Sequence, residues 1–166
     1  GGDWYYFDRS YTDWQKQFIY SVNNEVGESM FRECKLHTII LPDNITAIGK
    51  DAFLQCYQLS KINIPNRVEI LGERCFYNCH DLKELTIPNG VKEINSKAFY
   101  SCAFTTITIP NSVTNMNAGV FENCRNLESI VLPSAIQIID SYLLQDCISL
   151  KEISIPKSVT QINNNA

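Results

Sequence analysis

The sequence predicts an α/β solenoid, a stack of about six coils of about 23 residues each. An apolar residue opens each copy of the repeat, and the copies start 23 residues apart except for one step of 22: Leu36, Leu59, Leu82, Phe104, Leu127 and Leu150. All six prolines occupy one position of the repeat, and six of the seven cysteines occupy another. One such repeat cannot bury its apolar face alone, so the copies must stack on one another.

A short strand is expected near the start of each coil. Three residues precede each proline, and the outer two are apolar while the middle one is often polar, as in Ile62-Asn63-Ile64. This alternation places the outer side chains in the core and the middle one in solvent. Stacked coils would align the triplets as a parallel sheet with strands about 4.8 Å apart. Proline cannot donate to the sheet, so it ends each strand at the same place.

The rest of each coil is predicted from three further columns. Two apolar positions follow the proline and indicate a second short extended segment. A small residue and a large one come next, as in Ala52-Phe53, and we interpret them as a short helical turn that fills the coil interior. Between these segments the first two copies carry Gly49 and Gly72, whereas later copies carry Asn or Asp, which also tolerate a positive φ.

Residues 1–33 precede the regular repeat and are predicted to form an aromatic-rich N-terminal cap on a solenoid of residues 34–166. Tyr11, Trp14, Phe18 and Val22 have the spacing of one helix face. A solenoid needs a cap because its terminal coil would otherwise expose core side chains. An aromatic platform that binds sugar is the alternative interpretation. The sixth repeat stops at Ala166, within the pattern, so we expect the chain to be a fragment of a longer protein.

The cysteines are predicted to belong to the core. Cys75 replaces Ala in an inward-facing column, and the other six share the column three residues after the large apolar residue: Cys34, Cys56, Cys79, Cys102, Cys124 and Cys147. Buried free cysteine behaves as a small hydrophobe, so a reduced ladder is expected. Disulfides between successive coils stay open as an alternative, because the coil spacing is close to the span of that bond.

The composition argues against several classes of function. The net charge is −4 and the Lys and Arg residues are scattered, unlike a nucleic-acid-binding surface. No apolar run approaches the roughly 18 residues of a membrane-spanning helix, so no membrane insertion is expected. The sequence contains no Gly-rich phosphate loop, and its cysteines are placed in the core. We therefore expect no enzymatic activity, no cofactor and no metal site.

The repeat resembles the BspA-like leucine-rich repeat of the Treponema pallidum type. The family consensus is close to Leu-x-x-Ile-x-Ile-Pro-x-x-Val-x-x-Ile-Gly-x-x-Ala-Phe-x-x-Cys-x-x, and the first copy, from Leu36 to Cys56, matches it almost throughout. The resemblance covers residues 31–166 and implies a leucine-rich-repeat right-handed superhelix. It also implies an extracellular or cell-surface protein of host-associated bacteria or parasitic protists, linked to adhesion.

Two surfaces are candidates for binding a partner. In leucine-rich-repeat proteins the strand-bearing sheet forms the concave binding face, which here would present Thr38, Ile40, Lys61, Asn63, Glu84, Thr86, Thr106, Thr108, Ser129 and Val131. These residues lack the Trp, Tyr and Arg side chains that anchor most interfaces. A ridge beside the phenylalanine column has better anchor chemistry and carries Tyr57, Tyr77, Tyr100 and Arg125.

The function predicted from these observations and from the resemblance is a protein-interaction or adhesion module. Its partner would be a protein, either of the host extracellular matrix or of another microbial surface. A passive structural spacer within a larger surface protein is the alternative, since regular repeats also serve as stalks.

Overall fold

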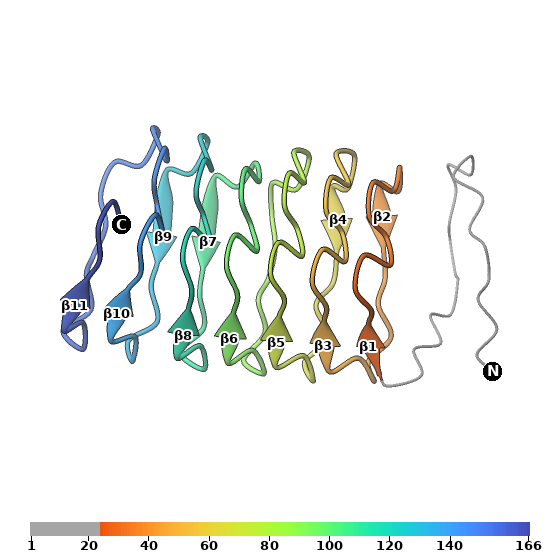
Figure 1. Cartoon of the computed structure of the whole chain (residues 1–166), viewed down its shortest axis with the longest axis horizontal. Coiled ribbons are helices and arrows are strands. Elements are labelled where there is room, and N and C mark those ends of the chain that lie inside the picture. The colour runs from red at the N-terminus through yellow and green to blue at the C-terminus, as the bar shows by residue number, and fades with distance from the viewer. Residues whose placement is uncertain (1–23) are drawn as a thin grey trace.

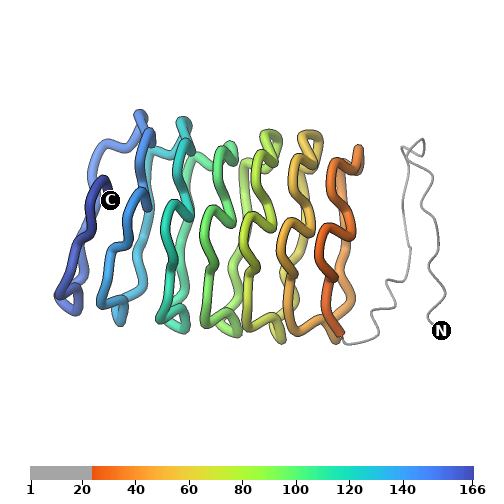
Figure 2. Tube along the Cα trace, in the orientation of Figure 1, coloured from red at the N-terminus to blue at the C-terminus, as the bar shows by residue number. Residues whose placement is uncertain are grey.

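The computed structural model describes residues 24–166, which form a solenoid of coils stacked in sequence order, as predicted (Figures 1 and 2). Successive coils lie side by side in a nearly straight row in Figure 2. Each coil contributes one or two very short strands, which pair in parallel with strands of its neighbours. No α-helix occurs within these residues, and the predicted cap helix around residues 11–22 lies outside them.

Two rows of strands run along the stack, and Figure 1 shows them at opposite ends of the coils. One row precedes the prolines and contains β2 (Thr38–Ile39), β4 (Lys61–Ile62), β7 (Thr106–Thr108) and β9 (Ser129–Val131). The other row contains β1 (Glu25–Val26), β3 (Ala47–Ile48), β5 (Ile70–Leu71), β6 (Glu93–Ile94), β8 (Asn115–Met116), β10 (Ile138–Ile139) and β11 (Gln161–Ile162). The predicted alternation is confirmed in the first coil, where Ile39 and Leu41 are buried and Ile40 is 75% exposed.

The longer sheet lies in the second row, whereas the sequence suggested one continuous sheet before the prolines. Strands β1-β3-β5-β6-β8 form a five-stranded parallel sheet, while the first row contains only the pairs β2–β4 and β7–β9. The pairing of β2 with β4 stops early because the side chain of Asn63, and not its backbone, forms the hydrogen bonds with the backbone of Leu41. Its Oδ1 accepts a hydrogen bond from the Leu41 N–H at 2.7 Å, and its Nδ2 donates to the Leu41 carbonyl at 2.9 Å.

A stack of phenylalanine rings fills the centre of the solenoid. Neighbouring rings are nearly parallel, at 1–14°, with centroids 5.2–5.6 Å apart, and come from Phe31, Phe53, Phe76, Phe99 and Phe121. Phe104 opens the coil that follows the 22-residue step, and it packs edge-on against Phe99 at 5.6 Å and 75°. The coils from Phe31 to Phe121 are therefore joined to one another through apolar contacts of their interiors.

The segment around each phenylalanine is a pair of turns, and the predicted short helical turn is wrong. Two residues of each complete coil there have a positive φ, in the first full coil Asp51 at 56° and Gln55 at 60°. Their N–H groups donate to the carbonyls of Glu73 and Tyr77 in the next coil, at 2.9 and 2.7 Å. A helix would use these N–H groups within its own coil. The left-handed residues instead turn them toward the neighbouring coil.

The glycines at positions 49 and 72 are explained by close packing between coils, and not by the positive φ that the sequence suggested. Among residues 24–166, only Gly119 is a glycine with a positive φ. A Cβ atom on Gly72 would lie 2.6 Å from the carbonyl carbon of Gly49, so these two coils approach too closely for a side chain. In later coils the column is polar, and Asn117 Nδ2 donates to Asn95 Oδ1 at 2.9 Å. These side chains form hydrogen bonds between coils.

The stack also includes residues before the predicted boundary at residue 34. Strand β1 pairs with β3, which places Val26 opposite Ile48, and Val26 is fully buried. Phe31 stacks on Phe53 at 5.2 Å. The parallel stack therefore begins no later than Glu25.

Candidate functional site

A stacked pair of tyrosines is the best-formed surface feature of the described residues. Tyr77 and Tyr100 occupy the same position of consecutive coils, each directly after a buried phenylalanine. Their rings are 4.3 Å apart between centroids and nearly parallel, at 4°. Lys97 Nζ lies 5.3 Å from the centroid of the Tyr100 ring, within the range of a cation–π contact. We call Arg74, Tyr77, Lys97 and Tyr100 the tyrosine ridge.

The Tyr77 phenol keeps its proton at physiological pH and can donate a hydrogen bond. Both tyrosines are partly buried. Burial, together with the adjacent Tyr100, raises the pKa of Tyr77 above its usual value. The stack therefore offers two phenol groups on a rigid aromatic base.

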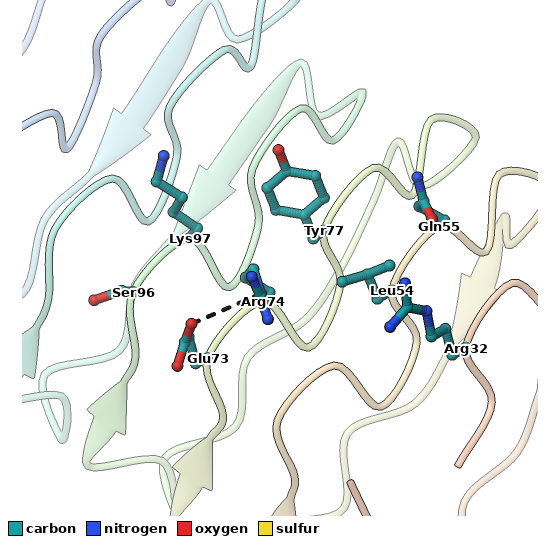
Figure 3. A pocket seen from close by; sticks show the side chains of 8 residues that line it. All are labelled: Arg32, Leu54, Gln55, Glu73, Arg74, Tyr77, Ser96 and Lys97. Carbon is teal, nitrogen blue, oxygen red and sulfur yellow. Dashed lines mark ion pairs between the residues drawn. The ribbon is translucent and has the colours of Figure 1, made fainter. Parts of the chain in front are cut away.

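An open depression of about 480 Å³ adjoins the ridge (Figure 3). It is lined by turn segments of four successive coils: Arg32, Leu54, Gln55, Glu73, Arg74, Tyr77, Ser96 and Lys97. The lining thus combines both signs of charge with one aromatic and one aliphatic side chain. Such a surface can pack against apolar atoms of a ligand while hydrogen-bonding its polar groups.

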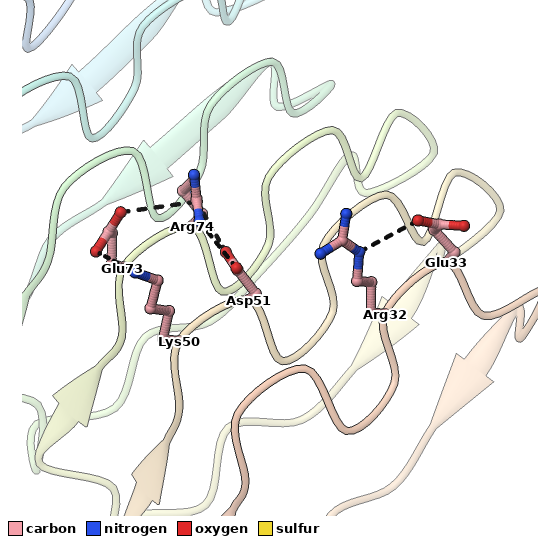
Figure 4. A network of polar contacts seen from close by, with 6 residues as sticks. All are labelled: Arg32, Glu33, Lys50, Asp51, Glu73 and Arg74. Atoms are coloured by element: carbon pink, nitrogen blue, oxygen red, sulfur yellow. Dashed lines mark hydrogen bonds and ion pairs between the residues drawn. The ribbon is translucent and has the colours of Figure 1, made fainter.

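Arg74 is held in place by Asp51 of the preceding coil (Figure 4). Its Nε and Nη2 donate to the two carboxylate oxygens at 2.8 and 2.9 Å. The Asp51 side chain is 7% exposed and that of Arg74 is 37% exposed, so the carboxylate is buried beneath the guanidinium. These hydrogen bonds raise the pKa of Arg74 further, and Glu73 lies 3.7 Å from its Nε.

The other cations around the depression are paired as well. Lys97 Nζ lies 3.1 Å from Glu122 Oε2, and the Glu122 side chain is mostly buried. Arg32 Nε lies 3.2 Å from Glu33 Oε1. Each cation that lines the depression therefore has a carboxylate within 4 Å, so the site carries little net charge despite its three basic residues.

The predicted ridge is split into two groups by the structure. Tyr77 and Tyr100 come together, but Tyr57 stands three positions later in its coil and packs against His80 instead, with ring centroids 5.2 Å apart. Arg125 belongs to a second, smaller depression of about 260 Å³, which it shares with His80. Tyr57 and Arg125 are thus part of a separate surface.

The ten candidate residues of the strand row are all exposed, in agreement with their predicted outward orientation. The register brings Thr38 opposite Lys61, and Thr108 opposite Val131. Ile40 and Val131, 75% and 54% exposed, are the large apolar side chains on this face. Glu84 and Thr86 belong to a coil without a strand in this row, so they interrupt the ribbon.

Sequence reasoning missed Arg74 and Lys97, although a signal for them exists. Each stands three residues before a tyrosine of the ridge, so a basic-x-x-Tyr-x-Cys pattern occurs in two consecutive coils. In a stack of regular coils, a pattern that recurs at the repeat length places its members side by side. The two cations could thus have been placed beside the tyrosines.

Within residues 24–166, no group of three or more His, Cys, Asp or Glu side chains is arranged to hold a metal ion. Over the same residues, no helix is long and apolar enough to cross a membrane. All seven cysteines are free thiols, and six of them are buried.

Comparisons with known proteins agree with this architecture. The family model described as the BspA type leucine-rich repeat region matches residues 6–60 and 46–166, with six copies. A leucine-rich repeat protein from Bacteroides ovatus is 33% identical with a TM-score of 0.82, over 84% of this chain and 37% of that one. The leucine-rich repeat protein of T. pallidum is 28% identical with a TM-score of 0.80, over 83% of this chain and 66% of that one.

A leucine-rich cell surface protein from Faecalibacterium prausnitzii is 26% identical over 82% of this chain and 52% of its own length, with a TM-score of 0.48. No curated protein matches the chain. The chain thus spans 37% and 66% of the lengths of the Bacteroides ovatus and T. pallidum proteins. Because the family model covers nearly all of its residues, the chain belongs to the BspA-type leucine-rich repeat family.

Proposed function

We propose that this chain is a protein-interaction module of a cell-surface or secreted protein, and that it binds a partner protein through the tyrosine ridge and the adjoining depression. The observation that carries the proposal is the stacked pair Tyr77–Tyr100, at 4.3 Å and 4°, beside Arg74. Tyrosine and arginine are enriched among the residues that dominate the energy of protein interfaces.

Preorganisation of the ridge supports this proposal. Ring stacking restricts Tyr77 and Tyr100, and two hydrogen bonds from Arg74 to Asp51 restrict the guanidinium. Ordering a free side chain at an interface costs about 0.5–1.5 kcal/mol, so side chains that are already ordered lose less on binding. The ridge can therefore contribute more of its contact energy to affinity.

The paired charges favour a partner that is recognised by packing and hydrogen bonds. Arg74 and Lys97 are paired with Asp51 and Glu122, so the ridge has no excess positive charge to attract an acidic partner. We expect the association to depend only weakly on salt, because long-range attraction between net charges is what salt screens. A neutral protein surface with exposed aliphatic and amide groups fits this chemistry.

The family supports a role in protein interaction, and adhesion to a host-matrix or microbial surface protein is the form that we propose. The alternative, a passive spacer, is favoured by one observation on the strand row. The side chain of Asn63 forms hydrogen bonds with the backbone of Leu41, so part of that face stabilises the solenoid and is not available to a partner. The spacer predicts that neither surface binds a partner.

A binding titration against immobilised fibronectin, fibrinogen and other host-matrix proteins tests the proposal. Three variants are compared with the parent chain: Tyr77→Ser with Tyr100→Ser, Thr86→Glu with Thr108→Glu, and Tyr57→Ser as the matched control, since Tyr57 is an exposed tyrosine outside the stack. We expect the first variant to weaken binding by about 30-fold or more, as loss of a hot spot of about 2 kcal/mol does. The other two variants should bind as the parent does.

Other outcomes reassign the surface or the function. Loss of binding only in the Thr86 and Thr108 variant would place the site on the strand row. No saturable binding by the folded parent chain to any member of the panel would favour the spacer. Circular dichroism of each variant shows whether it is folded before its binding is interpreted.

A further inference from the structure

The thiols of the cysteine column follow a regular pattern of hydrogen bonds over most of its length. Each thiol donates to the carbonyl of the stacked phenylalanine in the preceding coil. Cys79 donates to Phe53 at 3.3 Å, and Cys102 donates to Phe76 at 3.2 Å. Cys124 and Cys147 repeat the contact at 3.2 Å. Each of these four thiols is therefore bonded to a backbone carbonyl, and not to another thiol.

Cys34 and Cys56 depart from this pattern. Their sulfur atoms lie 2.8 Å apart, and Cys56 also donates to the Phe31 carbonyl at 2.9 Å. No other pair of cysteines among residues 24–166 forms a thiol–thiol hydrogen bond. Cys34 is also the one cysteine of the seven that is not buried. The first pair of the column thus combines contact between sulfurs with access from solvent.

The backbone holds these two residues in register. The Phe31 N–H donates to the Ala52 carbonyl at 2.8 Å, and the Glu33 N–H donates to the Leu54 carbonyl at 2.7 Å. Both bonds lie just before the pair along each coil, and they keep the two coils at the spacing of parallel strands, about 4.8 Å. That spacing lies within the Cα separations of about 4.4–6.8 Å found in disulfides.

We propose that Cys34 and Cys56 form a modification site, a pair of thiols that a small-molecule disulfide such as oxidised glutathione converts to a disulfide bond. The Cys34 thiolate attacks one sulfur of glutathione disulfide, which forms a mixed disulfide and releases one glutathione thiolate. Cys56 then loses its proton to solvent and attacks Cys34 Sγ, and the second glutathione thiolate leaves. Two protein thiols are oxidised, and one glutathione disulfide is reduced to two glutathione molecules.

The order of attack follows from the surroundings of the two thiols. Hydrogen bonding between the two sulfurs lowers the pKa of Cys34, whereas the same contact and burial raise the pKa of Cys56. Cys34 is the more accessible sulfur and forms the thiolate at lower pH, so it reacts first. Burial also raises the pKa of Cys75 and Cys102, but these two thiols, unlike Cys56, form no hydrogen bond with a solvent-accessible thiol that could react first.

The bond would fasten the coil that contains β1 to the first full coil. The two cysteines are 22 positions apart, so the disulfide closes one complete coil. Cross-linking restricts the unfolded chain and so stabilises the closed segment. The site is independent of the proposed partner binding, since neither cysteine belongs to the tyrosine ridge or to the strand row.

Peptide mapping of the whole chain after incubation with oxidised glutathione tests the proposal. Free thiols are alkylated under denaturing conditions, and the chain is cut with trypsin without reduction. We expect a linked pair of the peptides 33–35 and 51–61, which lacks two hydrogen atoms, and alkylation of the other five cysteines. The midpoint of urea unfolding should rise on oxidation and return on reduction.

Two variants separate this site from general oxidation. Cys34→Ser should remove the linked peptide and the shift in midpoint, whereas Cys124→Ser, in the same column, should retain both. Seven alkylated cysteines, a stable glutathione adduct on Cys34 without the link, or a link between other cysteines would each overturn the proposal. The linked peptide is sought in the parent chain, so this result does not depend on the folding of either variant.

Discussion

Asp51 accepts two hydrogen bonds from Arg74 at 2.8 and 2.9 Å, although both residues occupy the same position of the repeat. Both also have a positive φ, 56° and 53°. Stacking in register places equivalent residues directly beside each other, and like charges in that arrangement repel. Asp51 and Arg74 instead carry opposite charges, as do Lys50–Glu73, Glu69–Lys92 and Glu128–Lys151, which pair within their columns at 2.8–3.2 Å. Lys97 follows Arg74 in the same column with the same sign, and its partner is Glu122, in another column.

Replacement of Arg74 tests how much its ion pair with Asp51 contributes to the stability of the folded chain. Arg74→Met would leave the carboxylate of Asp51 buried without its partner, which costs about 1–3 kcal/mol of unfolding free energy. Urea unfolding measures the change. Arg125→Met serves as the control, because Arg125 is exposed and bonds only to Asn123 two residues away. If Asp51→Asn does not recover part of the loss in the double variant, the two residues are not coupled.

The phenylalanine stack should dominate stability. Phe76 is fully buried between Phe53 and Phe99, so Phe76→Ala should lower the unfolding free energy by about 3–5 kcal/mol. Ile148→Ala removes a side chain that is 72% exposed and should change it by less than about 0.5 kcal/mol. Thermal and urea unfolding of both variants give the comparison. Similar losses in the two would mean that the stack does not support the solenoid.

The left-handed positions predict one substitution that stabilises the chain. Tyr142 has a φ of 62° and a side chain that is 41% exposed, and a bulky residue in this region is strained by about 1–2 kcal/mol. Tyr142→Gly should therefore raise the unfolding free energy by about 0.5–1 kcal/mol, after the greater chain entropy of glycine is subtracted.

Gly119 occupies the same position one coil earlier, with a φ of 68°, and it provides the reverse test. Gly119→Ala should be destabilising because its Cβ would lie 2.7 Å from Glu122 Oε2. Chemical unfolding should thus shift in opposite directions for Tyr142→Gly and Gly119→Ala. A shift in the same direction would show that backbone strain does not control these positions.

Burial of thiols makes the folded state sensitive to alkaline pH. Burial raises the pKa of Cys147 from 9.0 to about 11, and raises that of Cys75 and Cys102 further. Below pH 9.0 these thiols are protonated in both states, so their stabilising contribution is complete. Above it the unfolded chain ionises first, and the unfolding free energy falls by about 1.4 kcal/mol per pH unit for each such thiol.

Urea unfolding between about pH 8 and about pH 10, with reductant present, measures this slope. Cys102→Ala should make the slope shallower by the contribution of one thiol, even though the variant is less stable at every pH. A parent chain whose stability does not change over this interval would contradict the burial of the ladder.

The core could be derived from particular residues of the sequence. The position of each proline marked the end of a triplet, and the alternation of Ile39, Ile40 and Leu41 identified which side chains face inward. The column of phenylalanines predicted the interior. These inferences succeed because each column repeats six or seven times, so that one noisy position cannot obscure its pattern.

The sequence by itself determined the repeat, the order of the coils and the buried columns, since apolar periodicity is a property of the chain alone. The tertiary structure decided what depends on contacts between coils. These contacts include the left-handed turns at Asp51 and Gln55, the stacking of Tyr77 on Tyr100 rather than on Tyr57, and the contact of Cys34 with Cys56. The physical reason is that these N–H groups and side chains find their partners in a neighbouring coil, and those partners exist only once the coils are stacked.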